Sequence, residues 1–320
     1  MNWGVQEGAR VRSWSAEALE ARIVRYRDLV PCRNAFIDTR TPGSDAKENF
    51  TIIGPGVSEN ADQHIHIVEP HGFNIGGARQ PPRCVNSQHS HDTAEVFVVH
   101  SGTWRFTFGE HGEDAQVDAE PGDIVSFPIH IFRGFENVGE ETGFLWSVLG
   151  GDDPGRVLWA PEVFRMAQEY GLVLLENGAL VDTTIGQSPP TGVKPMPVTS
   201  PEAIARLRKM RPEEVDQVIA RTSCQPGLVE ELVIGPGGQL APTEDFTVSR
   251  LIIGAGESNG ESNSPNTEVV FVHCGAAEIT TPDATIMLER GDTMTVPPGL
   301  SRFYQALGEG AELIVVRGIG

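Results

Sequence analysis

The feature that most constrains this chain is an internal repeat of strand-like sequence. Residues 95–102 read EVFVVHSG, and residues 268–275 read EVVFVHCG, at an offset of 173 residues. A Gly-Asp-x4-Pro motif begins at Gly122 and again at Gly291, at an offset of 169 residues. Self-similarity of this kind indicates two copies of one structural unit. We therefore expect two related β-units with other sequence before and between them.

The composition agrees with many short strands joined by turns. The 320 residues include 36 glycines and 23 prolines, which disfavours a helical bundle. The formal net charge of −20 repels phosphate backbones and anionic lipid, so we expect no nucleic-acid or membrane partner. No apolar run approaches the roughly 18 residues that a membrane span needs. The fold class predicted at this stage is all-β.

Pattern changes along the chain divide it into four segments. Helical spacing of apolar residues predicts a helix over 15–30, with Ser15 as its N-cap, and further helices over 161–170, after Ser200 and over 212–221. The four predicted segments are a helical N-terminal arm (1–50), a first β-barrel (51–150), a helical and Pro-rich insert (151–225) and a second β-barrel (226–320).

The cysteines indicate a reducing environment. The chain has four cysteines, and no two of them form a CxxC pair. Widely separated cysteines are typical neither of a disulfide scaffold nor of a zinc knuckle. The sequence therefore predicts reduced thiols and a cytoplasmic protein.

The first β-unit contains residues of the kind that bind a metal. His89 and His91 are two positions apart, so on a strand both side chains face the same way. Glu95 follows after a short turn and opens the next strand. Two imidazoles and a carboxylate that converge inside a barrel form a 2-His-1-carboxylate set, which suits non-haem Fe(II) and leaves positions open for substrate and O₂.

These residues also carry a resemblance to the cupin superfamily. The spacing His89-x-His91-x3-Glu95-x6-Gly102 is similar to the first cupin motif at each of its fixed residues after the opening. The second cupin motif has a metal-binding histidine at the position that Arg133 occupies here. Arginine stays protonated and cannot ligate a cation, so the resemblance leaves the metal site without its usual third histidine.

The rest of the second motif is similar in part. Gly122, Pro128 and Asn137 match it, and His130 occupies the position of its turn glycine. His130 is therefore either a turn residue or a replacement metal ligand that swings toward the site.

The second repeat keeps the barrel residues but not the histidines. Ser262 and Ser264 stand at the two histidine positions, whereas Glu268 and Arg302 match Glu95 and Arg133. The whole arrangement resembles a bicupin, that is, two jelly-roll antiparallel barrels, of which the second has lost its metal ligands. A Glu–Arg ion pair inside each barrel is the simplest consequence.

The resemblance implies a function as a metal-dependent dioxygenase of the quercetinase and gentisate kinds. His89, His91 and Glu95 would hold Fe(II), or alternatively Mn, Ni, Zn or Cu, because all of these accept such ligands. Arg133 would neutralise an enol, phenol or carboxylate substrate, unless it is instead paired with Glu95. The partner expected is a small molecule, and a homodimer is the assembly we consider.

Two other function classes remain open from the sequence. One is a non-catalytic bicupin in which Arg133 and Arg302 bind small carboxylates. The other is a cupin isomerase or lyase, in which a metal polarises a carbonyl group and no O₂ is consumed.

Overall fold

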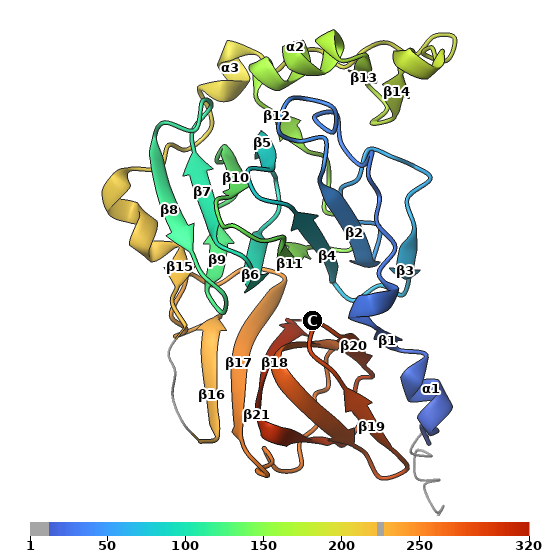
Figure 1. The fold of residues 1–320 in the computed structure, drawn as a ribbon, viewed down its shortest axis with the longest axis vertical. Coiled ribbons are helices and arrows are strands. Elements are labelled where there is room, and N and C mark those ends of the chain that lie inside the picture. Colours follow the sequence, from blue (N-terminus) through green and yellow to red (C-terminus); the bar gives the residue numbers. More distant parts are fainter. Residues whose placement is uncertain (1–12, 223–226, 320) are drawn as a thin grey trace, which may run out of the picture.

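The computed structural model describes residues 13–222 and 227–319. It contains two β-units stacked one on the other, with the short helices placed around them (Figure 1). The N-terminal unit contains strands β2 to β11, and the C-terminal unit contains strands β16 to β21. The mostly β architecture predicted from the repeat is confirmed.

The N-terminal unit is made of two sheets that enclose an apolar core. The first sheet contains, in spatial order, β15 (Ile219–Ala220), β9 (Ile124–Phe127), β6 (Glu95–Ser101), β11 (Gly143–Gly150), β4 (Phe73–Gln80), β2 (Glu48–Ile53) and β3 (Ile65–Ile67). The second contains β12 (Leu158–Trp159), β5 (Val85–Ser90), β10 (Arg133–Asn137), β7 (Trp104–Phe108) and β8 (Ala115–Ala119). All neighbouring strands of these sheets are antiparallel except β2 and β3, which are parallel.

Strand β7 shows how the sequence builds this core. Trp104, Phe106 and Phe108 are fully buried, whereas Arg105 and Thr107 between them are partly exposed. Alternation with period two places the aromatic residues on one face of the strand. They pack with residues from both sheets and so form part of the core.

The C-terminal unit repeats this topology with longer strands. Its sheet contains, in spatial order, β1 (Ile23–Val24), β20 (Thr293–Val296), β18 (Glu268–Thr280), β21 (Phe303–Gly318), β17 (Phe246–Gly254) and β16 (Val229–Ile234), and β19 (Thr285–Leu288) pairs with β18. Strand β18 corresponds to β6 and β7 together. Gly275, with a φ of 70°, takes the place of Gly102, with a φ of 82°, at the bend. A side chain is strained at both positions.

The two predicted jelly-roll units are present, but neither is closed into a ring by hydrogen bonds among the described residues. Over the residues that the structure describes, hydrogen bonding leaves each sheet with two open edges. The N-terminal unit is a sandwich of two sheets, and the C-terminal unit curls a single sheet by means of its long strands. Twisted sheets can enclose a core in this way without closing into a ring.

The long helix predicted over 15–30 is wrong. Helix α1 spans only Ala16–Glu20, although Ser15 does cap it as predicted, by accepting a hydrogen bond from the Ala18 amide. A short strand and the 3-10 turn η1 (Tyr26–Asp28) follow it. Strand pairing of β1 with β20 in the other unit overrides the helical spacing of this segment.

The segment between the units is only partly helical. Helix α2 (Pro161–Glu169) and the single turn α3 (Pro201–Ile204) begin where predicted, and Ser200 caps α3. Residues 212–221 form the 3-10 helix η3 (Pro212–Gln217) and strand β15 instead of one α-helix. The remaining elements are the hairpin of β13 (Leu172–Leu174) and β14 (Leu180–Asp182) and the 3-10 turn η2 (Thr183–Ile185).

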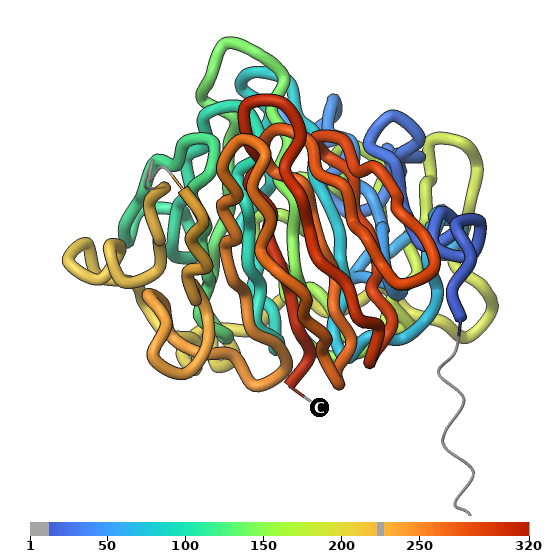
Figure 2. Tube along the Cα trace, turned by 90° about the horizontal axis from the view of Figure 1, so that it is seen from below, coloured from blue at the N-terminus to red at the C-terminus, as the bar shows by residue number. Residues whose placement is uncertain are grey.

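A continuous apolar layer joins the two units. It contains buried residues of β4, β6, β9 and β11 from one unit and of β16, β17, β18 and β21 from the other. At its centre the rings of Trp146 and Phe271 stack, with centroids 4.8 Å apart, and Trp146 Nε1 donates a hydrogen bond to Thr293. The strands of the C-terminal sheet lie side by side beneath the N-terminal unit (Figure 2).

The two units also exchange edge strands. The arm strand β1 extends the C-terminal sheet, with Ile23 opposite Met294, and β15 extends the N-terminal sheet, with Ile219 opposite Val125. Met294 and Val125 are equivalent positions of the repeat. The C-terminal sheet thus contains a strand from the arm that precedes the N-terminal unit. The N-terminal sheet contains a strand from the segment that precedes the C-terminal unit.

Equivalent aspartates fasten both exchanged strands. Asp292 accepts hydrogen bonds from the Arg25 guanidinium and the Tyr26 amide, and Asp123 accepts them from the Arg221 guanidinium and the Thr222 amide. These are the aspartates of the repeated Gly-Asp motif. Its recurrence in the sequence thus has a structural reason.

His100 and His273 lie in the layer between the units. Their ring centroids are 5.5 Å apart, and His100 also contacts Phe271. Burial, followed by the charge of Arg290, lowers the pKa of His273 to about 4, and burial and the neighbouring His273 lower the pKa of His100 to about 3. Both side chains are therefore neutral at pH 7, and their place is structural, in the packing between the units.

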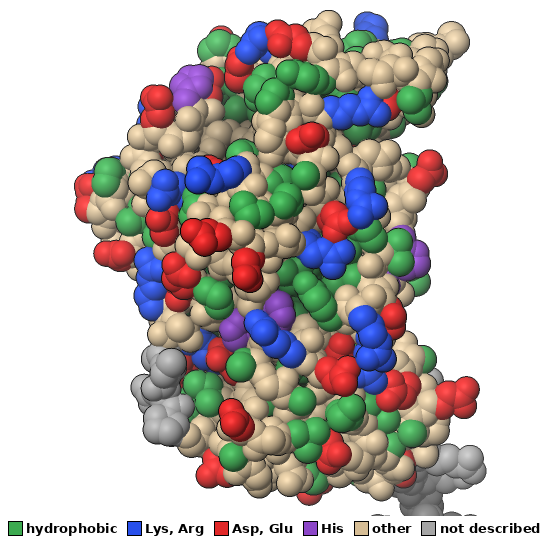
Figure 3. All heavy atoms as spheres, viewed as in Figure 1, with side chains coloured by type: hydrophobic (Ala, Val, Ile, Leu, Met, Phe, Trp, Pro, Cys, Tyr) green, Lys and Arg blue, Asp and Glu red, His purple; other side chains and the backbone are tan. Residues whose placement is uncertain are grey.

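Charged side chains of both signs are interspersed over the face shown in Figure 3, without a basic area that would suit a phosphate backbone. Within the described part of the chain, no helix combines the length and apolar character required to cross a bilayer.

Removing the ring at the centre of the interface should destabilise the whole chain. We expect Trp146→Ala to lower the free energy of unfolding by about 3–5 kcal/mol, because the cavity left in a packed layer does not collapse fully. Urea denaturation measures this. Val68→Ala, at a side chain that is 74% exposed, is the control and should change it by less than about 0.5 kcal/mol.

The buried histidines should make the fold sensitive to acid. As the pH falls from about 6.5 toward 4, the unfolded chain takes up protons that the folded His100 and His273 do not, so stability falls by about 1.4 kcal/mol per pH unit for each histidine. We expect His100→Leu to reduce the pH dependence of the free energy of unfolding by about 1.4 kcal/mol per pH unit below pH 6.5. Urea denaturation at a series of pH values from 4.5 to 7 measures this. A slope equal to that of wild type would contradict the assignment, and His111→Gln on an exposed loop is the control.

Candidate metal centre

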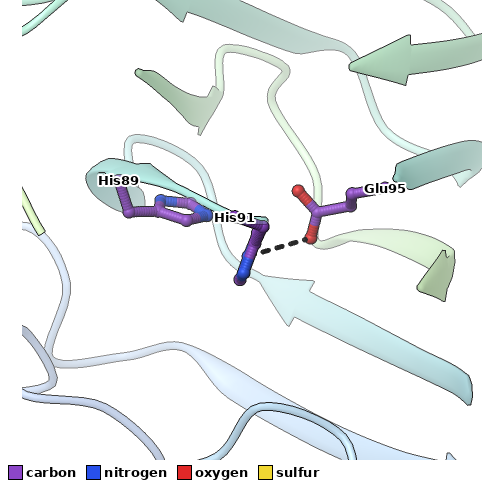
Figure 4. A group of neighbouring side chains, drawn as sticks. All are labelled: His89, His91 and Glu95. Carbon is purple, nitrogen blue, oxygen red and sulfur yellow. Dashed lines mark ion pairs between the residues drawn. The ribbon is translucent and has the colours of Figure 1, made fainter. Parts of the chain in front are cut away.

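The candidate ligands come from two neighbouring strands of different sheets. His89 lies in β5, His91 follows one residue after its end, and Glu95 opens β6. Along β6, Glu95 has the same parity as Phe97 and Val99, whose side chains face the core of the N-terminal unit. The three side chains therefore approach one another from two directions (Figure 4).

The ligand atoms of these residues meet at one point. One atom from each of His89, His91 and Glu95 lies within 4.8 Å of the other two, and His91 Nε2 is 3.7 Å from Glu95 Oε1. All three side chains are buried. The three candidate ligands predicted from the sequence thus lie together, with ligand atoms close enough to share one ion.

Both histidines are held in the neutral form that binds metals. Burial first, and then the positive charge of Arg133, lower the pKa of each ring well below its ordinary value. His89 Nδ1 lies 2.7 Å from the Ser87 carbonyl oxygen, which can only accept, and 3.4 Å from Asn86 Nδ2, which can only donate. The much shorter contact with the carbonyl places the proton on Nδ1 and leaves the lone pair on Nε2. Within the described residues His91 Nδ1 is buried without a hydrogen-bond partner.

Arg133 and Glu95 form the expected buried ion pair. Arg133 Nε and Nη2 lie 3.0 and 2.6 Å from the same carboxylate oxygen, Oε2 of Glu95. The other oxygen, Oε1, is the one that faces His91. The two sequence hypotheses for Glu95, ion pair and metal ligand, are therefore compatible, because each uses a different oxygen.

The guanidinium has little capacity left for a substrate. Besides the bonds to Glu95, Arg133 Nη1 lies near the carbonyl oxygens of His89 and Ile131, at 3.5 and 3.4 Å. The side chain is almost fully buried. In this arrangement Arg133 orients Glu95, and capture of a substrate anion by Arg133 would require it to give up these contacts.

The structure does not bring His130 to the trio. Its side chain is 52% exposed, and Nε2 lies 3.2 Å from Oδ1 of Asp92. Its φ of 57° is in the left-handed region, as expected at a position where the cupin motif has glycine. The placement is that of a turn residue, so the alternative of a swung-in ligand has no geometric support here.

A cavity of about 70 Å³ opens beside the trio. That volume holds roughly five water molecules, which fits a substrate of a few non-hydrogen atoms. His89, His91 and Glu95 form part of its wall. The other lining side chains are mainly apolar, with a few polar groups, and include Phe36, Phe50, Thr51, Phe97, Asn86, Phe135, Ser147 and Trp159.

The equivalent place in the C-terminal unit contains no imidazole. Ser264 Oγ donates a hydrogen bond to the Asn266 carbonyl oxygen, and the guanidinium of Arg302 forms an ion pair with Glu268. Arg317 and the Tyr304 hydroxyl also donate to Glu268. The carboxylate is thus fully engaged, and the sequence prediction of an ion pair in this unit is confirmed.

Several residues around the site could not be found by spacing. Trp159 in β12 pairs with His89 along the strand, and its ring lies 5.3 Å from the His89 ring, centroid to centroid. Glu59 accepts a hydrogen bond from Trp159 Nε1, and burial raises its pKa to about 8. Asp38 and Lys47 form a buried ion pair behind β5. All four lie in irregular segments or short strands, where no regular spacing of residues predicts which side chains face the site.

Comparison with known proteins identifies the fold. Residues 78–149, which contain the trio, match the model of the Cupin domain. Oxalate decarboxylase from Lactobacillus farciminis, solved as a formate complex, superposes with a TM-score of 0.55 at 12% identity, over 92% of this chain and 85% of that one. A deletion mutant of Bacillus subtilis oxalate decarboxylase gives a TM-score of 0.56 at 14% identity, over 92% and 76%.

An 11S globulin shares the same architecture. Procruciferin, an 11S globulin from Brassica napus, has a TM-score of 0.51 at 15% identity, over 77% of this chain and 76% of that one. No curated protein matches the sequence. The chain therefore has the fold of the cupin superfamily, with a cupin domain at residues 78–149, and identities this low establish the fold only.

The residues present fit a divalent metal ion. Two neutral imidazoles, one with a free lone pair fixed by its hydrogen bond, and one carboxylate oxygen not used by Arg133 form a set of three donors. A metal held by these three residues, which line the cavity, would have coordination positions left for a substrate.

Loss of either imidazole should abolish metal binding. We expect wild type to be purified with a metal and His89→Ala and His91→Ala to be purified without one, because two remaining donors do not hold a divalent ion tightly. Elemental analysis of the untreated proteins measures this. His130→Ala is the matched control and should keep the metal, whereas its loss there would restore His130 as a ligand.

Proposed function

We propose that the N-terminal unit is a mononuclear metal-dependent enzyme of the dioxygenase type, with Fe(II) as its metal and a small enol, phenol or carboxylate as its substrate. The observation that supports this is the convergence of His89, His91 and Glu95 at the wall of one cavity. A divalent metal held there would supply Lewis acidity and, in the case of iron, redox chemistry with O₂.

The residues of the chain would contribute binding and orientation. His89 and His91 would bind the metal through neutral imidazoles, and Glu95 through the oxygen that Arg133 leaves free. Arg133 would keep Glu95 ionised and fix its direction, acting as a positioning residue. The apolar rings of the cavity wall would exclude water from the reacting atoms, which strengthens electrostatic interactions inside.

A second candidate is a lyase that acts on a small carboxylate without consuming O₂. Two observations favour it: the fold is shared with oxalate decarboxylases, and a cavity of about 70 Å³ suits a substrate of that size better than a large aromatic compound. One of the similar structures, again Bacillus subtilis oxalate decarboxylase, is described with Mn(II) centres, so manganese is the metal to test beside iron.

Metal analysis followed by oxygen measurement separates these candidates. We expect the purified protein to carry about one equivalent of Fe or Mn per chain, because the described residues offer one set of three ligands. Small enols, phenols and carboxylates, catechols and oxalate included, are then screened in an oxygen electrode and for release of CO₂. Oxygen uptake that is lost in His91→Ala supports the dioxygenase, and turnover without oxygen uptake supports the lyase.

A third outcome would remove both enzymatic proposals. If wild type grown with iron and manganese carries no metal, and small carboxylates raise its melting temperature equally with and without chelator, the protein binds ligands without a metal. That result would favour the non-catalytic bicupin.

A further inference from the structure

The end of the N-terminal arm, residues 38–47, lies against one edge of β5. The Val85 amide donates to the Gly43 carbonyl at 2.8 Å, and Ser44 Oγ donates to the Val85 carbonyl at 2.7 Å. These contacts occupy the edge of β5 that β12 leaves free, because β12 pairs only with Ser90 and His89. The arm therefore completes the strand that carries the first metal ligand.

Asp38 and Lys47 make the next contacts along the same strand. Asp38 Oδ2 accepts a hydrogen bond from the Ser87 amide at 3.0 Å, and Lys47 Nζ donates to Asn86 Oδ1 at 3.1 Å. The two charged groups are paired with each other and have no solvent exposure. They hold both the backbone and a side chain of β5 directly before His89.

This part of β5 is irregular. On the partner strand β10, Arg133 lies opposite His89 and Phe135 lies opposite Asn86, so three residues of β5 span the length of two in β10. An extra residue of this kind is a β-bulge, which leaves a backbone group outside the ladder and redirects the next side chains. The Ser87 amide is in the bulge, and Asp38 supplies its acceptor.

We propose that Asp38 and Lys47 are positioning residues for His89: by holding the bulge of β5 they fix the ring so that Nδ1 is protonated and Nε2 is directed to the metal. The link is the Ser87 peptide, whose amide is bound by Asp38 and whose carbonyl accepts from His89 Nδ1 at 2.7 Å. The effect on metal affinity rests on the proposed function, whereas the effect on the ring does not.

Energetics support a role beyond simple stability. Burying two charges costs several kcal/mol in desolvation, and an apolar pair of similar size is often as stable as a buried ion pair. What an apolar pair cannot provide is an acceptor for the Ser87 amide and a donor for the Asn86 side chain. The charged pair supplies both, in a fixed direction, at the position that sets the ring of a metal ligand.

The test uses the full-length protein and two variants, Asp38→Asn and Lys47→Met. Arg40→Met is the matched control, because Arg40 lies in the same segment but pairs with Asp182 instead of β5. The first measurement is nitrogen NMR of the metal-free protein labelled at its histidine rings, with the His89 signals assigned by their loss in His89→Gln. The second is the dissociation constant for Mn(II) or Fe(II), measured by competition with a chelating dye.

In wild type and in Arg40→Met we expect His89 to be protonated at Nδ1. In Asp38→Asn and Lys47→Met we expect a mixture of the two tautomers and metal binding weakened about 10- to 100-fold, the range found when partners of metal ligands are removed. Variants that fold, keep the Nδ1 proton and bind metal as wild type does would overturn the proposal. A wild-type ring protonated at Nε2 would overturn it too, even if neither variant folds.

The two measurements keep this proposal separate from the proposed function. A wild type that binds no metal, while the variants still change the His89 tautomer, contradicts the enzyme and supports the positioning role. If both variants fold and bind metal as tightly as wild type does, the result contradicts the positioning role and leaves the proposed function standing.

Discussion

The apolar layer between the two units is the interaction on which the rest of the structure depends. It buries one face of β6 through Val96 and Val98, while Phe97 and Val99 bury the other face inside the N-terminal unit. Because side chains alternate along a strand, a shift by one residue would exchange these faces. The same alternation sends Glu95 into the unit. Packing between the units therefore also determines where the carboxylate of the site points.

The exchanged edge strands add a second constraint to this layer. Strand β1 completes the C-terminal sheet, and β15 completes the N-terminal sheet, each fastened by the aspartate of a Gly-Asp motif. Each exchanged strand pairs with a strand that would otherwise lie at a sheet edge, so neither unit is complete without a segment from outside it. The C-terminal unit, which lacks the histidines, thus packs against and supports the unit that contains the candidate ligands.

The buried Glu–Arg pair is common to both units, and the histidines are not. In the C-terminal unit Glu268 binds Arg302, Arg317 and Tyr304, so both of its carboxylate oxygens are used in contacts within the core. In the N-terminal unit one oxygen of Glu95 binds Arg133, and the other faces an imidazole. The difference between a structural and a candidate functional carboxylate thus lies in what surrounds its second oxygen.

The sequence by itself determined the repeat, the β class, the core stripe of β7 and the trio of His89, His91 and Glu95, because all of these depend on spacing within or between short strands. It could not decide between an ion pair and a metal ligand for Glu95, since that depends on which oxygen meets which neighbour. The sequence also could not show that residues 15–30 are mostly not helical, or that Asp38 and Lys47 contact the strand that carries His89. Those outcomes were decided by the tertiary structure, because contacts between segments far apart in the chain override local periodicity and place charges that no local pattern records.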